Sequence, residues 1–151
     1  MSPLTLIHVG ISLIGIGSGL VVVYGFLTGK TLRGWNLLFL TTTIATSVTG
    51  FFFKFKGVTP GIVVGAVSLV VLAVAVVAFR KGWAKTYIVT ASLAEFFNVL
   101  VLIVQSFQKI PVLHGLAPTG KEPIIAVLQG LAFGVFAVFA VVGIRKLPKA
   151  V

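Results

Sequence analysis

The chain has 151 residues, of which 58% are hydrophobic and only 9% are charged. Soluble domains usually carry about 25% charged residues, and disordered chains are poor in apolar ones, so both classes are excluded. The net charge of +10 comes from Lys and Arg in short clusters between long uncharged runs, which argues against a nucleic-acid surface. Cysteine is absent, which excludes disulfides and thiolate metal sites.

Long apolar runs dominate the sequence. Each run has about the length needed to cross a hydrocarbon layer of roughly 30 Å as a helix, and none alternates as the strands of a membrane barrel do. We therefore expect an all-α integral membrane helical bundle, with residues 1–151 as one domain. The alternative is four crossings with one run re-entrant. The five runs, predicted as transmembrane helices, are 4–27, 36–53, 60–79, 86–107 and 123–143.

The first run is too long for a cleaved signal, and no Lys or Arg precedes it, so we interpret it as a mature span. Ser12, Gly15 and Gly19 share one of its faces, with His8 one turn outward. Small residues four apart let membrane helices approach closely. This face is therefore predicted to pack against another helix.

The second run contains "TTTIATSVTG", six hydroxyls in ten positions between very apolar neighbours. Thr42, Thr46 and Thr49 lie on one face of a helix, and Thr43 and Ser47 lie on another. A helical Thr can donate to a carbonyl one turn earlier and needs no water. The hydroxyls form either a packing surface or a hydroxyl-lined path for water or a polar solute.

The third run repeats the small-residue pattern. Gly61, Gly65 and Ser68 follow helical spacing along one face. We expect that face to pack closely against a neighbouring helix.

The fourth run holds the one acid predicted inside the membrane. Ser92, Glu95, Asn98 and Gln105 form a polar stripe, with Glu95 near the middle of the run. A carboxylate there costs about 2.5–3.5 kcal/mol on insertion scales, so the stripe must face the bundle. No Lys or Arg lies within a predicted span, and an unpaired buried carboxyl takes up a proton. We expect Glu95 to be neutral at pH 7 and hydrogen-bonded to Asn98, Ser92 or the second run.

The connection 108–123 and the start of the chain place three potential ligands on one side of the membrane. His8, His114 and Glu122 form a weak zinc candidate, and His8 with His114 a weak haem candidate; no spacing requires either. No cofactor, metal or catalytic residue is predicted, since no nucleotide-binding or hydrolase motif is present. The connection itself is expected to lie over the helix ends, because Ile110, Val112, Leu113 and Leu116 are apolar.

The fifth run offers Gly130 and Gly134, with Ala126 and Ala137 beside them, as a further small-residue seam. Several such seams in a short chain predict a tight bundle.

Basic residues set the orientation. Eight lie at one set of span ends and four at the other, and the richer set belongs in the cytoplasm. The N-terminus is then outside and the C-terminus cytoplasmic, in a plasma membrane. The eight are Lys30, Arg33, Arg80, Lys81, Lys85, Arg145, Lys146 and Lys149; the four are Lys54, Lys56, Lys109 and Lys121.

Three segments, "LTGKTLRGWN", "TTTIATSVTGF" and "VQSFQKIPVLHGLAPTGKEP", resemble a group of small bacterial multi-span inner-membrane proteins with no assigned activity. The resemblance covers most of the chain and implies a bacterial inner membrane. It implies no catalytic residues. An apolar or aromatic residue is usual in that group where this chain has Glu95, so the resemblance does not favour a shared role for the carboxyl.

Three functions are compatible with these features. The first is a non-enzymatic bundle that packs as a homo-oligomer or as an accessory subunit of a larger membrane assembly, with lipid and other membrane subunits as its partners and no nucleic acid. The second is a small permease or channel for protons, cations or a polar solute that uses Glu95. The third is a membrane enzyme, or a haem or metal carrier, that uses His8 and His114.

Overall fold

A computed structural model describes residues 1–54 and 56–147; Lys149, one of the eight basic residues counted above, lies outside the described part. The described part is all-α. Its six helices are α1 (Pro3–Thr28), α2 (Arg33–Gly50), α3 (Pro60–Lys81), α4 (Ala84–Lys109), α5 (Pro111–Leu116) and α6 (Pro123–Lys146).

Proline and glycine mark many of the helix ends. Four helices have Pro in their first turn, where the missing N–H costs no hydrogen bond. The hydroxyls of Ser2 and Thr59 accept hydrogen bonds from the first-turn amides of α1 and α3. Gly29 and Gly82 end the same two helices with φ of 68° and 72°, a backbone conformation that favours glycine.

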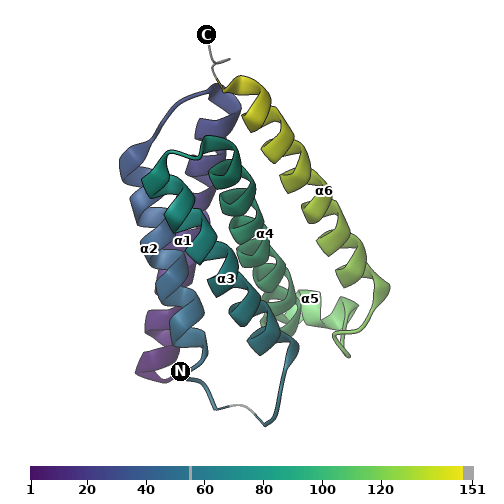
Figure 1. Cartoon of the computed structure of the whole chain (residues 1–151). Helices are drawn as coiled ribbons and strands as arrows, with labels where there is room; N and C mark the ends of the chain where they lie inside the picture. Colours follow the sequence, from purple (N-terminus) through teal and green to yellow (C-terminus); the bar gives the residue numbers. More distant parts are fainter. Residues whose placement is uncertain (55, 148–151) are drawn as a thin grey trace.

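The five long helices run up and down the bundle, and each is antiparallel to the long helix before it (Figure 1). The short α5 lies at the end of the bundle where α1 begins. Helix α1 packs against α2, α4 and α6, and α3 packs against α2 and α4. The opposite end, where α1, α3 and α6 finish and α2 and α4 start, is here called the basic end. The other seven of the eight basic residues lie in or beside it.

Among the described helices, α1, α3, α4 and α6 are each long and apolar enough to cross a bilayer. The outer surface agrees with this, because large apolar side chains such as Leu131 and Val70 are more than 60% exposed. The protein is therefore a multi-pass membrane protein. Helix α2 is not among them, because Arg33 and Asn36 in its first turn, together with its hydroxyls, lower the mean hydropathy of an 18-residue helix.

The five predicted runs correspond to α1, α2, α3, α4 and α6; the starts at residues 60 and 123 coincide, and the other ends are displaced by one to three residues. Helix α5 was not predicted. It lies in the connection that was expected to cover the helix ends. Of the four apolar residues named there, only Leu113 packs against the apolar cluster formed by Phe107, Ala117 and Ile125. Ile110, Val112 and Leu116 are exposed instead.

The main core joins α1, α2, α3 and α4. Phe39 of α2 is fully buried at its centre and belongs to one cluster with Val22 of α1 and Leu72 of α3. The same cluster contains alanines of α3 and α4, whose small side chains let those two helix backbones come close together.

Candidate functional site

Glu95 lies inside the bundle, where α4 faces α1 and α2. Its side chain is 0% exposed. Gly19 of α1 leaves the space for it: a methyl group at Gly19 would lie 2.0 Å from Glu95 Oε2 and 2.9 Å from the Phe39 ring. The close approach of α1 and the burial of the carboxyl therefore depend on each other.

Asn98 connects Glu95 to α2. Its Nδ2 donates hydrogen bonds to Glu95 Oε2 at 3.0 Å and to Thr43 Oγ1 at 3.3 Å. Glu95 Oε1 is buried and has no hydrogen-bond partner within the described residues. Helices α1, α2 and α4 carry Lys or Arg only at their ends, so the carboxyl is held by an amide and not by a cation.

The remaining two members of the predicted stripe on α4 do not join this network. Ser92 Oγ and Gln105 Oε1 are buried, and neither has a hydrogen-bond partner in the part of the chain that the structure describes. The structure thus brings Glu95 and Asn98 together with Thr43, while Ser92 and Gln105 stay separate.

The hydroxyls of α2 have two different roles. Thr41 and Thr42 donate to carbonyls of their own helix, as a helical Thr does when it faces no partner. Thr43 and Thr49 reach other helices, while Thr46 Oγ1 is buried without a partner among the described residues. The contact with Asn98 therefore comes from Thr43, on the neighbouring face to Thr42, Thr46 and Thr49.

His8 meets Thr49 near the start of α1. Its Nδ1 lies 2.8 Å from Thr49 Oγ1, and the Thr49 hydroxyl donates to the carbonyl of Ala45 at 2.7 Å. Because that hydroxyl has one proton, His8 is the donor through Nδ1. The His8 ring also packs edge-on against Phe53, in the turn that follows α2, so His8 joins the start of α1 to the end of α2.

The two other candidate ligands lie elsewhere. His114 is exposed on α5. Glu122 Oε1 accepts hydrogen bonds from the backbone amide and hydroxyl of Thr119, and the amide contact lowers the pKa of its carboxyl. Within residues 1–54 and 56–147, no three His, Cys, Asp or Glu side chains gather as a potential metal site.

Asn36 and Tyr87 form a second buried polar pair that sequence reasoning missed. The Tyr87 hydroxyl donates to Asn36 Oδ1, and Asn36 Nδ2 donates to the carbonyl of Leu32 at 2.7 Å. The available signal was the seven-residue spacing of Asn36 and Thr43, which places both on one face of α2.

The predicted glycine seams differ in what they face. Gly15 lies against Thr42 and Thr43, where an added methyl group would be tightly placed at 3.3 Å from Thr43 Oγ1, and Gly65 lies against the Phe51 ring at van der Waals distance. The Ser12 hydroxyl donates to the carbonyl of His8 within α1. The remaining seam glycines face no other helix among the described residues: these are Gly61, Gly130 and Gly134.

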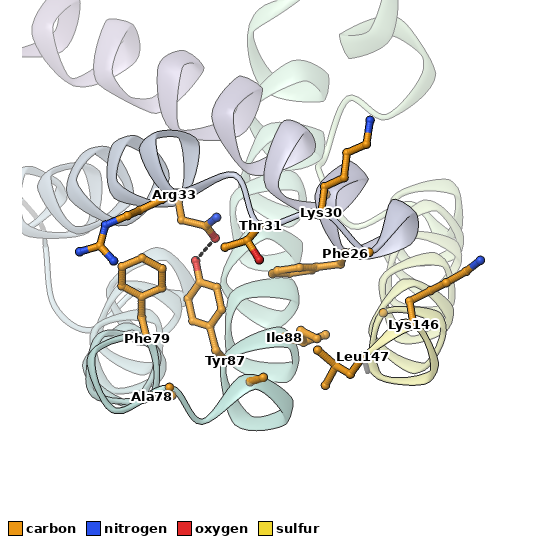
Figure 2. A pocket seen from close by; sticks show the side chains of 16 residues that line it. Phe26, Lys30, Thr31, Arg33, Ala78, Phe79, Tyr87, Ile88, Lys146 and Leu147 are labelled. Atoms are coloured by element: carbon orange, nitrogen blue, oxygen red, sulfur yellow. Dashed lines mark hydrogen bonds between the residues drawn. The ribbon is translucent and has the colours of Figure 1, made fainter. Parts of the chain in front are cut away.

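A cavity of about 350 Å³ lies at the basic end, with the Asn36–Tyr87 pair in its wall (Figure 2). Lys30, Arg33 and Lys146 are its cationic lining residues. It is a second polar region, separate from the Glu95 network.

No protein-family model, curated protein or solved structure matches this chain. The chain is a multi-span helical membrane protein. It has a buried Glu95–Asn98–Thr43 network, a His8–Thr49 contact and a cavity with cationic lining residues at one end.

Proposed function

We propose that this protein is a non-enzymatic membrane bundle that associates with further copies of itself through the outward face of α6. The observation that supports this is the open small-residue stripe on that helix. Methyl groups added at Gly130 or Gly134 would meet nothing within 4 Å among the described residues. Ala126 and Ala137, at helical spacing from them, are exposed as well.

Two physical arguments favour a helix on this face. Glycine in a helix costs about 1 kcal/mol relative to alanine, so an open pair of glycines weakens α6 without a packing gain. Small residues in lipid gain stability when another helix backbone approaches them. Of the four apolar helices, α6 also buries the smallest share of its length inside the chain.

The test is the mass of the purified protein in mild detergent and in lipid nanodiscs, measured by light scattering. The wild type should be an oligomer, and Gly130→Leu with Gly134→Leu should shift it to monomer. Gly17→Leu is the matched control, because Gly17 on α1 is equally open. A monomeric wild type, or an oligomer that survives the double change, would refute the proposal.

We further propose that all five long helices cross a bacterial inner membrane, with the basic end in the cytoplasm. The eight-to-four distribution of Lys and Arg supports this orientation. Because the chain lacks cysteine, single reporters can be introduced at Thr31 and Lys56, on either side of α2. They should react with impermeant thiol reagents from opposite faces of the membrane. Reaction from the same face would show that α2 does not cross.

A second candidate is a proton, cation or small-solute permease that uses Glu95. It is supported by polar atoms of α2 and α4 that are buried and have no partner in the described structure: Thr46 Oγ1, Ser92 Oγ and Glu95 Oε1. Such atoms need water or an ion in a low-dielectric interior. The polar groups of α2 recur at Asn36, Thr43 and Thr49, roughly 10 Å apart along the helix.

Proteoliposomes loaded with a pH-sensitive dye test this candidate. Proton flux should appear with the wild type and should be abolished by Glu95→Gln, which keeps the size of the side chain. Thr42→Val is the control, since Thr42 bonds only its own helix. Equal flux with and without the carboxyl would remove Glu95 from any transport path.

A further inference from the structure

The cavity at the basic end is enclosed by four parts of the bundle. Its lining comes from the end of α1, the start of α2, the turn between α3 and α4, and the end of α6. Figure 2 shows the Arg33 guanidinium on one side beside Phe79, and the side chains of Lys30 and Lys146 on the other side, with their ammonium ends pointing outward from the aromatic residues. Phe26 and Tyr87 lie between them. The cavity thus has aromatic and aliphatic walls that include the polar Asn36–Tyr87 pair, and three of its lining residues are cationic.

No Asp or Glu side chain lies near these cations. The sequence has two acidic residues, and neither is at this end: Glu95 is buried midway along α4, and Glu122 precedes α6 at the opposite end. No acidic side chain of this chain therefore neutralises Lys30, Arg33 or Lys146. An external anion would lower their mutual repulsion.

Helix ends explain only part of the arrangement. Lys146 is in the last turn of α6, where a cation is favourable, but Arg33 is the first residue of α2, where the positive end of the helix disfavours one. No side chain caps the first turns of α2 or α4, whose N-caps are Leu32 and Trp83. Anion-favouring amides and an arginine therefore meet at the same mouth.

The apolar lining distinguishes a lipid from a small soluble anion. Phe26, Phe79 and Ile88 face the cavity, and the Arg33 guanidinium lies 5.8 Å from the centre of the Phe79 ring. Inorganic phosphate would leave these surfaces unused. Trp35 and Trp83, about half exposed at this end, are residues that favour the headgroup level of a membrane.

We propose that this cavity binds the phosphate of an anionic phospholipid from the adjoining leaflet. Arg33, Lys30 and Lys146 contact the phosphate and headgroup, and the aromatic wall contacts the glycerol and the first carbons of the chains. Basic pockets between membrane helices are suited to such headgroups. The proposal requires only that the protein is in a membrane, and it does not depend on self-association.

Native mass spectrometry of the full chain in detergent tests it, with equal amounts of phosphatidylglycerol and phosphatidylcholine added. The wild type should retain phosphatidylglycerol preferentially. Arg33→Gln with Lys146→Gln should reduce that preference roughly 10- to 30-fold, since each cation near a lipid surface contributes about a fivefold effect. Lys54→Gln with Lys121→Gln removes the same charge at the opposite end and should leave the preference nearly unchanged.

Three outcomes would overturn the assignment. The first is an equal loss of preference in both double variants, which would show a general effect of net charge. The second is an unchanged preference for phosphatidylglycerol in the Arg33 and Lys146 double variant. The third is displacement of the lipid by millimolar inorganic phosphate, which would assign the cavity to a free anion. Arg33→Lys, which keeps the charge, should retain most of the preference and shows that the cavity is intact.

Discussion

The fit between Gly19 and Glu95 gives the sharpest test of the bundle interior. Replacing Gly19 by alanine adds a methyl group 2.0 Å from Glu95 Oε2, closer than any non-bonded contact allows. The carboxyl cannot move into solvent because it is fully buried, and Phe39 limits movement on the other side. We therefore expect both that α1 moves away from α4 and that Glu95 loses its hydrogen bond from Asn98.

The cost follows from these two responses. Overpacking a buried site costs about 1–3 kcal/mol, and a buried polar group that loses its partner costs about 1–3 kcal/mol. Alanine returns about 1 kcal/mol through its helix propensity. We expect Gly19→Ala to lower the free energy of unfolding by roughly 3 kcal/mol. Gly17→Ala should be neutral or stabilising, because nothing lies within 4 Å of that position among the described residues.

A double-mutant cycle identifies the carboxyl as the cause. In a Glu95→Ala background the added methyl occupies vacated space, so Gly19→Ala should cost less than about 1 kcal/mol there, a coupling of roughly 2 kcal/mol. Reversible unfolding in mixed micelles, followed by far-ultraviolet circular dichroism, gives each free energy. If the cost of Gly19→Ala is the same with and without the Glu95 side chain, the proposed contact is wrong.

Three further changes test other parts of the structure. Tyr87→Phe leaves the buried Asn36 oxygen without its donor and should cost about 1–3 kcal/mol in the same unfolding assay, with a cost below about 0.5 kcal/mol counting against the pair. Gly143→Ala places a methyl 3.0 Å from α1 and 3.2 Å from α4, so it should loosen α6 and speed amide exchange there, whereas Gly130→Ala at an open site should not. The hydrogen bond from the Thr119 amide lowers the pKa of Glu122, so its contribution to the loop is present above the ordinary Glu pKa. That contribution is lost as pH falls through the lowered pKa, so protection of the Thr119 amide relative to its intrinsic exchange rate should fall in the wild type but stay constant with pH in Glu122→Gln.

Hydropathy and small residues were enough to locate most of the helices. The runs of uncharged residues between basic clusters predicted α1, α3, α4 and α6 because lipid demands long apolar helices. The cost of a carboxylate in lipid predicted that Glu95 turns inward, and it does so beside Asn98.

The rotation of each helix about its axis was harder to predict. Helix α2 has hydroxyls on several faces, so periodicity alone could not decide between Thr42 and Thr43 as the partner of α4. Asn36 and Tyr87 lie 51 residues apart, and nothing local links them. Helix α5 was not predicted because it has only six residues, two of which are a proline and a glycine, and so short a segment shows no periodic pattern.

Helix α2 shows that mean hydropathy alone is a poor guide to whether a helix packs inside an apolar bundle. Its polar groups make it too polar to qualify on hydropathy, yet Asn36, Thr43 and Thr49 each meet a partner from α4 or α1. Polar groups that are satisfied by neighbouring helices cost much less in lipid than the same groups on an isolated helix. Of the six hydroxyls between residues 41 and 50, those of Thr43 and Thr49 meet α4 and α1, which supports the proposal that α2 crosses the membrane packed against these two helices.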